Sequence, residues 1–358
     1  MSLLLGGQTV APLFRRLGPV FAVAGAVVAA VTWPRAFDLE AYLDAAKLVA
    51  AGQDPYAATR AIGVAEWGQG QVYVSPPFIA HVLAPFSGLP LDAVYVAWVA
   101  ASLLAVLGAM RVVSRETLVA RAPMVVFSLV YVWGSLWMGQ VNLFTLAGLL
   151  LVFGTRSERM AGFGLALAIV TRALPAAFLV VLVVERRWRA IAWTALFGAL
   201  AVAIRPADWV AYVSIAREAA SLPTLPVFVQ TSLVPWPALW FVAAVAIAAV
   251  VAIAALVPTD RRLLAGTAVG FAIVLLPTNA WHHWLSFALA PLLLLGDGSP
   301  WGRRALLLFV GVSFLPLGTL SSAVALITLA AMLVVSARNL RDARPLVRPK
   351  PVGILGPP

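Results

Sequence analysis

Long apolar runs separated by short arginine-rich segments constrain this chain more than any other feature. Hydrophobic residues make up 63% of its 358 residues, charged residues make up 11%, and the mean hydropathy is +0.98. A soluble domain carries far more charge, whereas a helix that spans a bilayer needs about 20 consecutive apolar residues. The sequence therefore predicts an all-α polytopic membrane protein.

The apolar runs indicate about twelve membrane crossings. Several runs are shorter than an upright spanning helix requires, and such short helices are typical of membrane proteins that enclose a water-filled cavity. The expected crossings are 17–33, 92–112, 123–138, 140–155, 160–172, 174–185, 188–204, 236–257, 262–277, 281–296, 304–318 and 320–337.

The positions of the charges orient the chain in the membrane. Most of the 25 basic residues fall between the runs on one side, beginning with Arg15 and Arg16, and acidic residues prevail on the other side. The positive-inside rule then places both termini in the cytoplasm. The net charge of +11 is therefore a topology signal, and we expect no nucleic-acid partner.

This orientation depends on two decisions about the chain. Residues 76–90, which contain four prolines and His81, must lie in the outer interface and not cross the bilayer. Residues 160–185 must cross twice, with a break near Arg172 and Pro175.

These choices make residues 1–337 a single transmembrane domain with external segments at 34–91 and 205–235. Residues 338–358 are basic and proline-rich, which predicts a disordered cytoplasmic tail that lies against anionic lipids.

Cysteine is absent, so disulfides and thiolate catalysis are excluded. No residues have the spacing of metal ligands, and we expect no metal and no cofactor. Frequent Ala, Arg and Val favour a bacterial plasma membrane as the location.

Carboxylates gather in the first external segment, in the stretch FDLEAYLDAAKLVAAGQDPY at 37–56. Acidic side chains next to a membrane span are unfavourable unless they face water, a cation or a substrate. Apolar residues at helical spacing predict an amphipathic helix here, with Asp38 as its N-cap, Gly52 at its end and a turn at Asp54-Pro55. We expect the chemistry in this segment.

Five stretches, taken in order, resemble glycosyltransferase family 87, the polyprenyl-phosphate-mannose-dependent mannosyltransferases. The resemblance covers roughly residues 30–300. Besides 37–56, the stretches are VYVSPPFIAHVLAPFSGLP at 72–90, GQVNLFTLAGLLL at 139–151, TRALPAAFLVVLVVERRW at 171–188 and PTNAWHHWLSFALAPLLLL at 277–295. Two departures are present: family members commonly have Lys where Arg172 stands, and Ser-x-x-His-His where this chain has Asn279-Ala280-Trp281-His282-His283.

The resemblance implies a GT-C membrane enzyme whose first external loop carries a catalytic aspartate, which matches Asp38. Such an enzyme moves a sugar, here expected to be mannose, from a polyprenyl-phosphate donor to a glycolipid or lipid-linked glycan at the outer face, with inversion. Asp38 would take the proton of the acceptor hydroxyl. Residues expected to bind the phosphate or the sugar are Tyr42, Tyr56, Tyr73, Gln140, Asn142, Arg172, Gln230, Asn279, His282 and His283.

Each of these assignments has a structural alternative. Asp38 could serve only as a helix cap, and the two histidines could belong to an aromatic belt at the membrane interface. Gln140 and Asn142 could join helices, and Tyr73 could belong to a rigid turn. A secondary transporter or lipid flippase is the main alternative function, and it predicts internal repeats that we do not find. A catalytically inactive scaffold is a further alternative, for which Asp38 would be dispensable.

Overall fold

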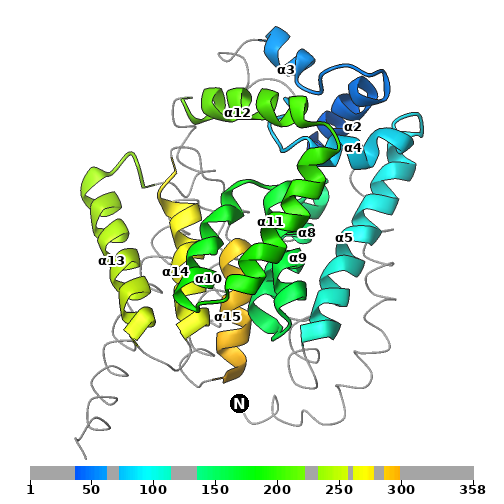
Figure 1. The fold of residues 1–358 in the computed structure, drawn as a ribbon. Coiled ribbons are helices and arrows are strands. Elements are labelled where there is room, and N and C mark those ends of the chain that lie inside the picture. Colours follow the sequence, from blue (N-terminus) through cyan, green and yellow to red (C-terminus); the bar gives the residue numbers. More distant parts are fainter. Residues whose placement is uncertain are drawn as a thin grey trace, which may run out of the picture.

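The computed structural model of the chain describes residues 37–62, 72–113, 135–221, 233–256, 261–277 and 286–298. Every regular element in these ranges is a helix. The longer helices stand side by side as a bundle, and several short helices lie across one end of it (Figure 1). The described part of the chain is therefore all-α, as the composition predicts.

The helices differ widely in length. α5 and α13 are the longest, and η2 and η3 are short 3₁₀-helices. In chain order they are α2 (Phe37–Ala50), α3 (Ala57–Ile62), α4 (Phe78–Leu83), η2 (Ala84–Phe86), α5 (Leu91–Val113), α8 (Asn142–Gly154), α9 (Glu158–Thr171), η3 (Leu174–Phe178), α10 (Leu179–Val184), α11 (Trp188–Ala203), α12 (Pro206–Ala220), α13 (Pro237–Leu256), α14 (Arg261–Leu275) and α15 (Ser286–Gly298).

Most of the predicted apolar runs in the described ranges coincide with a helix. The runs at 92–112, 140–155, 160–172, 188–204, 236–257 and 262–277 match α5, α8, α9, α11, α13 and α14, and the run at 174–185 forms η3 and α10. The run at 281–296 is described from Ser286 onward, where it forms α15. The runs at 17–33, 304–318 and 320–337 lie outside the described residues, as does 123–138 except for its last four positions.

Two described helices, α5 and α13, are long and apolar enough to cross a membrane, and the pair α11–α12 counts as a third if taken as one bent span. α8 and α14 are apolar but shorter. A helix of 13 residues rises only about 20 Å, less than the roughly 30 Å of a hydrocarbon core. The chain is thus a membrane protein by its apolar helices, while twelve crossings and the GT-C arrangement stay predictions.

The structure contains a short non-spanning segment within 76–90 and a break near Arg172 and Pro175, as the sequence predicts. α4 and η2 contain six and three residues, so 78–86 is too short to cross a bilayer. α9 ends at Thr171, Arg172 is extended with φ −149° and ψ 124°, and Pro175 stands at the start of η3. The chain then reverses direction, because Arg172 and Arg187 lie at opposite ends of the bundle.

α8 and α9 pack so closely that their backbones touch. A Cβ atom added at Gly148 would lie 2.4 Å from the carbonyl oxygen of Gly164, and one added at Gly164 would lie 2.4 Å from the carbonyl oxygen of Gly148. Small residues at such a crossing are the usual means of close helix packing in membranes. The pair fixes how Gln140, just before α8, sits relative to Arg172, just after α9.

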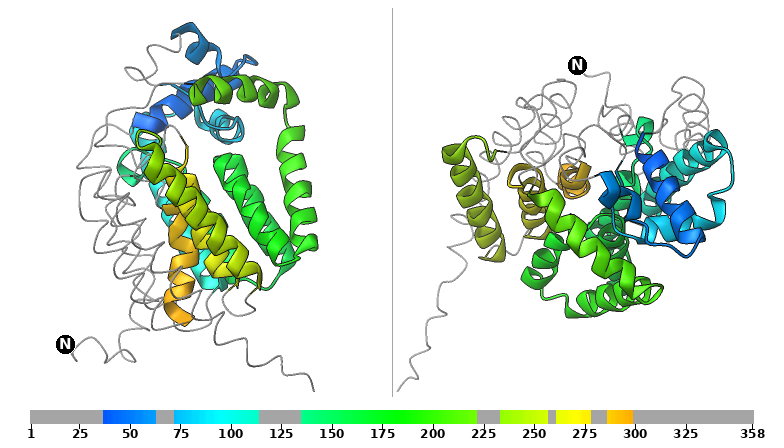
Figure 2. Two further views of the ribbon diagram at one scale, coloured as in Figure 1. Left: turned by 90° about the vertical axis from the view of Figure 1, so that its left-hand side faces the viewer. Right: turned by 90° about the horizontal axis from the view of Figure 1, so that it is seen from above.

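Five helices lie across one end of the bundle as a layer, which we call the cap layer: α2, α3, α4, η2 and α12 (Figures 1 and 2). α12 belongs to it because the chain bends by 102° between α11 and α12. α2 ends as predicted: Gly52, at φ +73°, follows it, and Asp54 then accepts the backbone N–H of Tyr56. The cap layer joins both predicted external segments.

Candidate active site

Asp38 lies in the first turn of α2, at the junction of the cap layer and the bundle. The helix begins at Phe37, so Asp38 is not the N-cap residue that the sequence predicts. The backbone N–H of Asp38 donates to the carbonyl oxygen of Met138 at 2.9 Å, and that of Leu39 donates to the same oxygen at 3.4 Å. This oxygen satisfies N–H groups that a capping side chain would otherwise accept, so the Asp38 carboxylate is left for other partners.

Two of the predicted site residues act on the Asp38 carboxylate. Gln140 hydrogen-bonds it through its side chain, and the charge of Arg172 acts on it. These residues come from separate elements: Asp38 from α2, Gln140 from the turn before α8 and Arg172 from the end of α9. A cation at the C-terminus of a helix is also favoured by the helix dipole, which helps to hold Arg172 there.

A chain of amide hydrogen bonds sets the orientation of Gln140. The Asn142 Nδ2 donates to the Oε1 of Gln140 at 2.6 Å and to the Oγ of Ser135 at 3.2 Å. With its oxygen engaged by Asn142, Gln140 presents its Nε2 donor toward the acceptor carboxylate of Asp38. Gly139, at φ +68°, makes the preceding turn possible. Both amide side chains are buried, so the arrangement is firmly packed.

The surroundings of Asp38 suit a carboxylate that accepts a proton. Burial raises the pKa of its carboxyl above the usual 3.8, while the charge of Arg172 and the hydrogen bond from Gln140 counteract part of that rise. A general base works best when its pKa lies near the working pH, because a more basic carboxylate accepts a proton more readily. Asp38 combines a raised pKa with a neighbouring cation, as active-site carboxylates often do.

Tyr42 lies one helical turn after Asp38 and borders the same site. Its hydroxyl interacts with Ser75 and with the backbone of Val141, and it lies within reach of the charges of Asp38 and Arg172. Burial raises the pKa of Tyr42 to about 12. The phenol is therefore neutral at physiological pH and can donate a hydrogen bond.

The hydroxyls of Tyr56 and Tyr73 are engaged by backbone oxygens. Tyr56 donates to the carbonyl of Ser75 at 2.8 Å, and Tyr73 donates to the carbonyl of Pro76 at 2.6 Å. The two rings stack with their centroids 5.2 Å apart, and both side chains are buried. They hold the Pro76-Pro77 stretch against the end of α2, and their contact with substrate stays a prediction.

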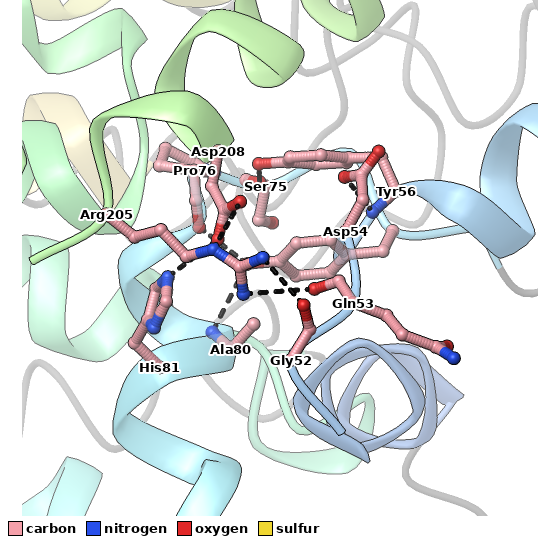
Figure 3. Close-up of polar contacts among 11 residues, drawn as sticks. Gly52, Gln53, Asp54, Tyr56, Ser75, Pro76, Ala80, His81, Arg205 and Asp208 are labelled. Carbon is pink, nitrogen blue, oxygen red and sulfur yellow. Dashed lines mark hydrogen bonds and ion pairs between the residues drawn. The ribbon is translucent and has the colours of Figure 1, made fainter. Parts of the chain in front are cut away.

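One side chain near the site was not assigned a role from the sequence. Tyr212, on α12, is packed with its ring 6.2 Å from that of Tyr56, and the charge of Arg172 acts on its hydroxyl. α12 is joined to the rest of the cap layer by Arg205, Asp208 and His81 (Figure 3). The Asp-Trp-x-x-Tyr spacing at 208–212, which puts three polar or aromatic groups on adjacent turns of a helix, was the available signal.

The remaining predicted residues Gln230, Asn279, His282 and His283 lie outside the described residues. Within the described ranges, no group of three His, Asp or Glu side chains is placed to hold a metal ion. The described site thus combines five groups where the cap layer joins the bundle: the carboxylate of Asp38, the guanidinium of Arg172, the amide of Gln140 and the phenols of Tyr42 and Tyr212.

A sequence model described as glycosyltransferase family 87 matches residues 73–278 of the chain, which is more than half of it. The matched range includes Tyr73, Gln140, Asn142 and Arg172, and it begins after Asp38. No curated protein and no solved structure shows significant similarity to the chain.

Proposed function

Because the chain belongs to glycosyltransferase family 87, we propose that it transfers a sugar, expected to be mannose, from a polyprenyl-phosphate donor to a glycolipid or lipid-linked glycan. Membership makes the chain a glycosyltransferase, and its apolar helices make it a membrane protein. An enzyme of that kind meets lipid-linked substrates in the bilayer. The polyprenyl-phosphate donor, the sugar and the outer-face location belong to the proposal.

In the proposed reaction, the acceptor hydroxyl oxygen attacks the anomeric carbon of the donor sugar. The bond from that carbon to the phosphate oxygen breaks, polyprenyl phosphate leaves with the bonding electron pair, and the hydroxyl proton passes to Asp38. Attack opposite the leaving group inverts the anomeric centre. Asp38 is supported as the base by its raised pKa and by its place at the end of the bundle where α8 and α9 present polar groups.

Arg172 would stabilise the negative charge on the departing phosphate. A guanidinium can donate two parallel hydrogen bonds to phosphate oxygens, which positions the group as well as neutralising it. The same residue lowers the pKa of Asp38, so it also keeps the base ionised. The single observation that carries the proposal is this meeting of Asp38, Gln140 and Arg172 from three separate elements.

The transporter or flippase is not favoured. Family membership points to an enzyme. In the described residues, Asp38, Gln140 and Arg172 gather at one end of the bundle, whereas a transporter is expected to bind its substrate near the middle of the membrane.

The test is transfer of radiolabelled mannose from synthetic polyprenyl-phosphate-mannose into membrane lipids. Wild type, Asp38→Asn, Asp38→Ala and Asp44→Asn would be compared at equal amounts of folded protein. Asp44 is the matched control, because it is an exposed carboxylate on the same helix, paired with Lys47 at 2.8 Å. We expect transfer by wild type and Asp44→Asn and loss of transfer in both Asp38 variants. Full activity in both Asp38 variants would exclude Asp38 as the base, and transfer only from a polyprenyl-phosphate arabinose or glucose donor would change the sugar.

A further inference from the structure

A buried carboxylate joins α12 to the first part of the cap layer. One oxygen of Asp208 lies 2.9 Å from the Nε2 of His81, on α4, and the other lies 3.3 Å from the Nε of Arg205. The Asp208 side chain is only 4% exposed. A buried carboxylate is strongly unfavourable without partners, so both contacts are needed to keep it there.

Arg205 extends the connection to the end of α2 (Figure 3). Its Nη2 donates to the carbonyl of Gly52 at 2.8 Å and its Nη1 donates to that of Gln53 at 3.2 Å. Those carbonyls belong to the turn that Gly52 makes possible after α2. We call Arg205, Asp208 and His81, with the two carbonyls, the α12 latch.

The α12 latch holds α12 in its direction across the end of the bundle. Only Ile204 and Arg205 separate α11 from α12, and the chain turns by 102° there. The contacts of the α12 latch lie directly after this bend. Asp208 and Arg205 therefore hold the first turn of α12 in place, so that the helix passes over the site.

Tyr212 is the side chain that this course brings to the site. It lies four residues after Asp208, so the two share a face of α12. Its ring contacts Tyr56 with centroids 6.2 Å apart, and Trp209 flanks it at the same separation. The charge of Arg172 acts on its hydroxyl. The rings of Tyr212, Tyr56, Tyr73 and Tyr42 follow one another at centroid distances of 6.2, 5.2 and 6.0 Å, so Tyr212 is connected to the site around Asp38 through a row of aromatic contacts.

We propose that the α12 latch holds Tyr212 beside Arg172, where its hydroxyl donates a hydrogen bond to the phosphate of a lipid-linked donor. The proposal rests on the proposed function for the identity of the ligand, but the latch itself does not. A phosphate group has more acceptor oxygens than one guanidinium satisfies, and a neutral phenol adds a donor without adding charge. Tyr212 is a substrate-binding residue in this proposal, and Asp208 and His81 are positioning residues that act through it.

The first experiment measures steady-state kinetics with the donor that supports transfer. Tyr212→Phe keeps both ring contacts and removes only the hydroxyl, so we expect the donor KM to rise about 10-fold while kcat changes less than about twofold. Asp208→Asn should raise the donor KM by a similar factor, because α12 is no longer held in its direction and Tyr212 is displaced from the donor. In the double variant the two increases in KM should not multiply, since both changes remove the same contact, the hydrogen bond from Tyr212 to the donor phosphate. Ser214→Ala, an exposed change on the same helix, should leave both constants unchanged.

An unchanged donor KM in Tyr212→Phe would overturn the binding role, and multiplicative effects in the double variant would overturn the link between the α12 latch and Tyr212.

Hydrogen–deuterium exchange tests the latch with no substrate. Asp208→Asn should speed exchange in 206–220 and 50–56, and leave α8 and α9 unchanged. Unchanged exchange in 206–220 would overturn the latch, whereas a wild type that transfers from no polyprenyl-phosphate sugar would count against the proposed function alone.

Discussion

The α8–α9 hairpin meets a carboxylate and an arginine at each of its ends, and the two pairs are built differently. At the end away from the cap layer, Glu158 pairs with Arg187. At the cap-layer end, Asp38 lies beside Arg172. In the first pair both carboxylate oxygens accept hydrogen bonds inside the protein. The Asp38 carboxylate instead is hydrogen-bonded by Gln140 and is acted on by the charge of Arg172.

Glu158 is engaged at both oxygens. One accepts from the Nε of Arg187 at 2.9 Å, and the other accepts from the backbone N–H of Ala190 at 3.1 Å, in the first turn of α11. Arg187 also donates to the carbonyl of Val152 at the end of α8. The pair thereby joins α8, α9 and α11, and a carboxylate at the start of α11 is favoured by the helix dipole.

Asp38 has a neutral amide as its hydrogen-bonding partner and a guanidinium that acts on it through charge. Its carboxyl is buried enough that its pKa is raised despite that guanidinium. The two pairs therefore differ in kind. Glu158 and Arg187 join helices through hydrogen bonds, whereas Asp38 is a carboxylate of raised pKa near a cation. The two ends should therefore respond to mutation in opposite ways.

The largest effect is expected for Asp38→Asn, which should lower kcat by about 10²- to 10⁴-fold because no base remains. The same change should leave the melting temperature at neutral pH unchanged or higher. A carboxyl whose pKa is higher in the folded than in the unfolded chain stabilises the fold below pH 3.8 and loses that contribution as pH rises through the raised pKa. Kinetics and thermal unfolding at pH 7, with Asp44→Asn as control, check both parts; a marked drop in melting temperature would contradict the comparison.

Arg172→Gln should lower kcat/KM by about 10²- to 10³-fold through loss of charge stabilisation. It should also move the acid limb of the pH–rate profile to higher pH, because Arg172 lowers the pKa of the base and activity falls as Asp38 takes up a proton. Arg172→Lys, which keeps the charge, is the matched variant, and its acid limb should lie close to the wild-type pH. The profile of kcat/KM from pH 4 to 8 is the measurement, and an acid limb at the wild-type pH in Arg172→Gln would contradict the prediction.

Gln140→Leu should lower kcat about 10-fold, because the Asp38 carboxylate loses one charge-assisted hydrogen bond. The acid limb should move in the same direction as in Arg172→Gln but by less, since Arg172 acts more strongly on the pKa of Asp38. Parallel pH–rate profiles of the two variants test the order. A larger displacement in Gln140→Leu would show that the hydrogen bond, and not the charge, dominates.

The smallest effect on catalysis is expected for Glu158→Gln. It removes the charge from the pair that joins α8, α9 and α11, so the free energy of unfolding should fall by about 1–3 kcal/mol while kcat per folded molecule stays at the wild-type value. Thermal unfolding in detergent and transfer assays on the folded fraction separate the two quantities. A loss of kcat comparable with that of Gln140→Leu would show that the far end of the hairpin contributes to chemistry.

Local signals in the sequence were enough to predict much of this fold. The apolar runs locate most of the described bundle helices, and Gly52 and Pro175 locate the end of α2 and the break after α9, because turns and helix ends depend on neighbouring residues. Gln140 and Arg172 could be selected because polar groups at the ends of apolar helices are few.

Contacts between distant segments could not be predicted in the same way. The N-cap assignment of Asp38 was wrong because Met138, far along the chain, supplies the acceptor for the first turn of α2. The contact between His81 and Asp208 spans 127 positions, and no periodic pattern encodes it. Tyr212 was overlooked for the same reason, since its proximity to Arg172 depends on the bend before α12.

The contact between Gly148 and Gly164 has a genetic consequence. Neither residue belongs to the candidate site, yet a single added methyl at either would force the two backbones apart and separate Gln140 from Arg172. In a saturation-mutagenesis screen scored by growth or product, both positions would return null alleles as complete as those of Asp38. Only a readout of folded protein would reveal that the lesion is architectural, so a map of loss-of-function alleles on this chain would overstate the extent of its active site.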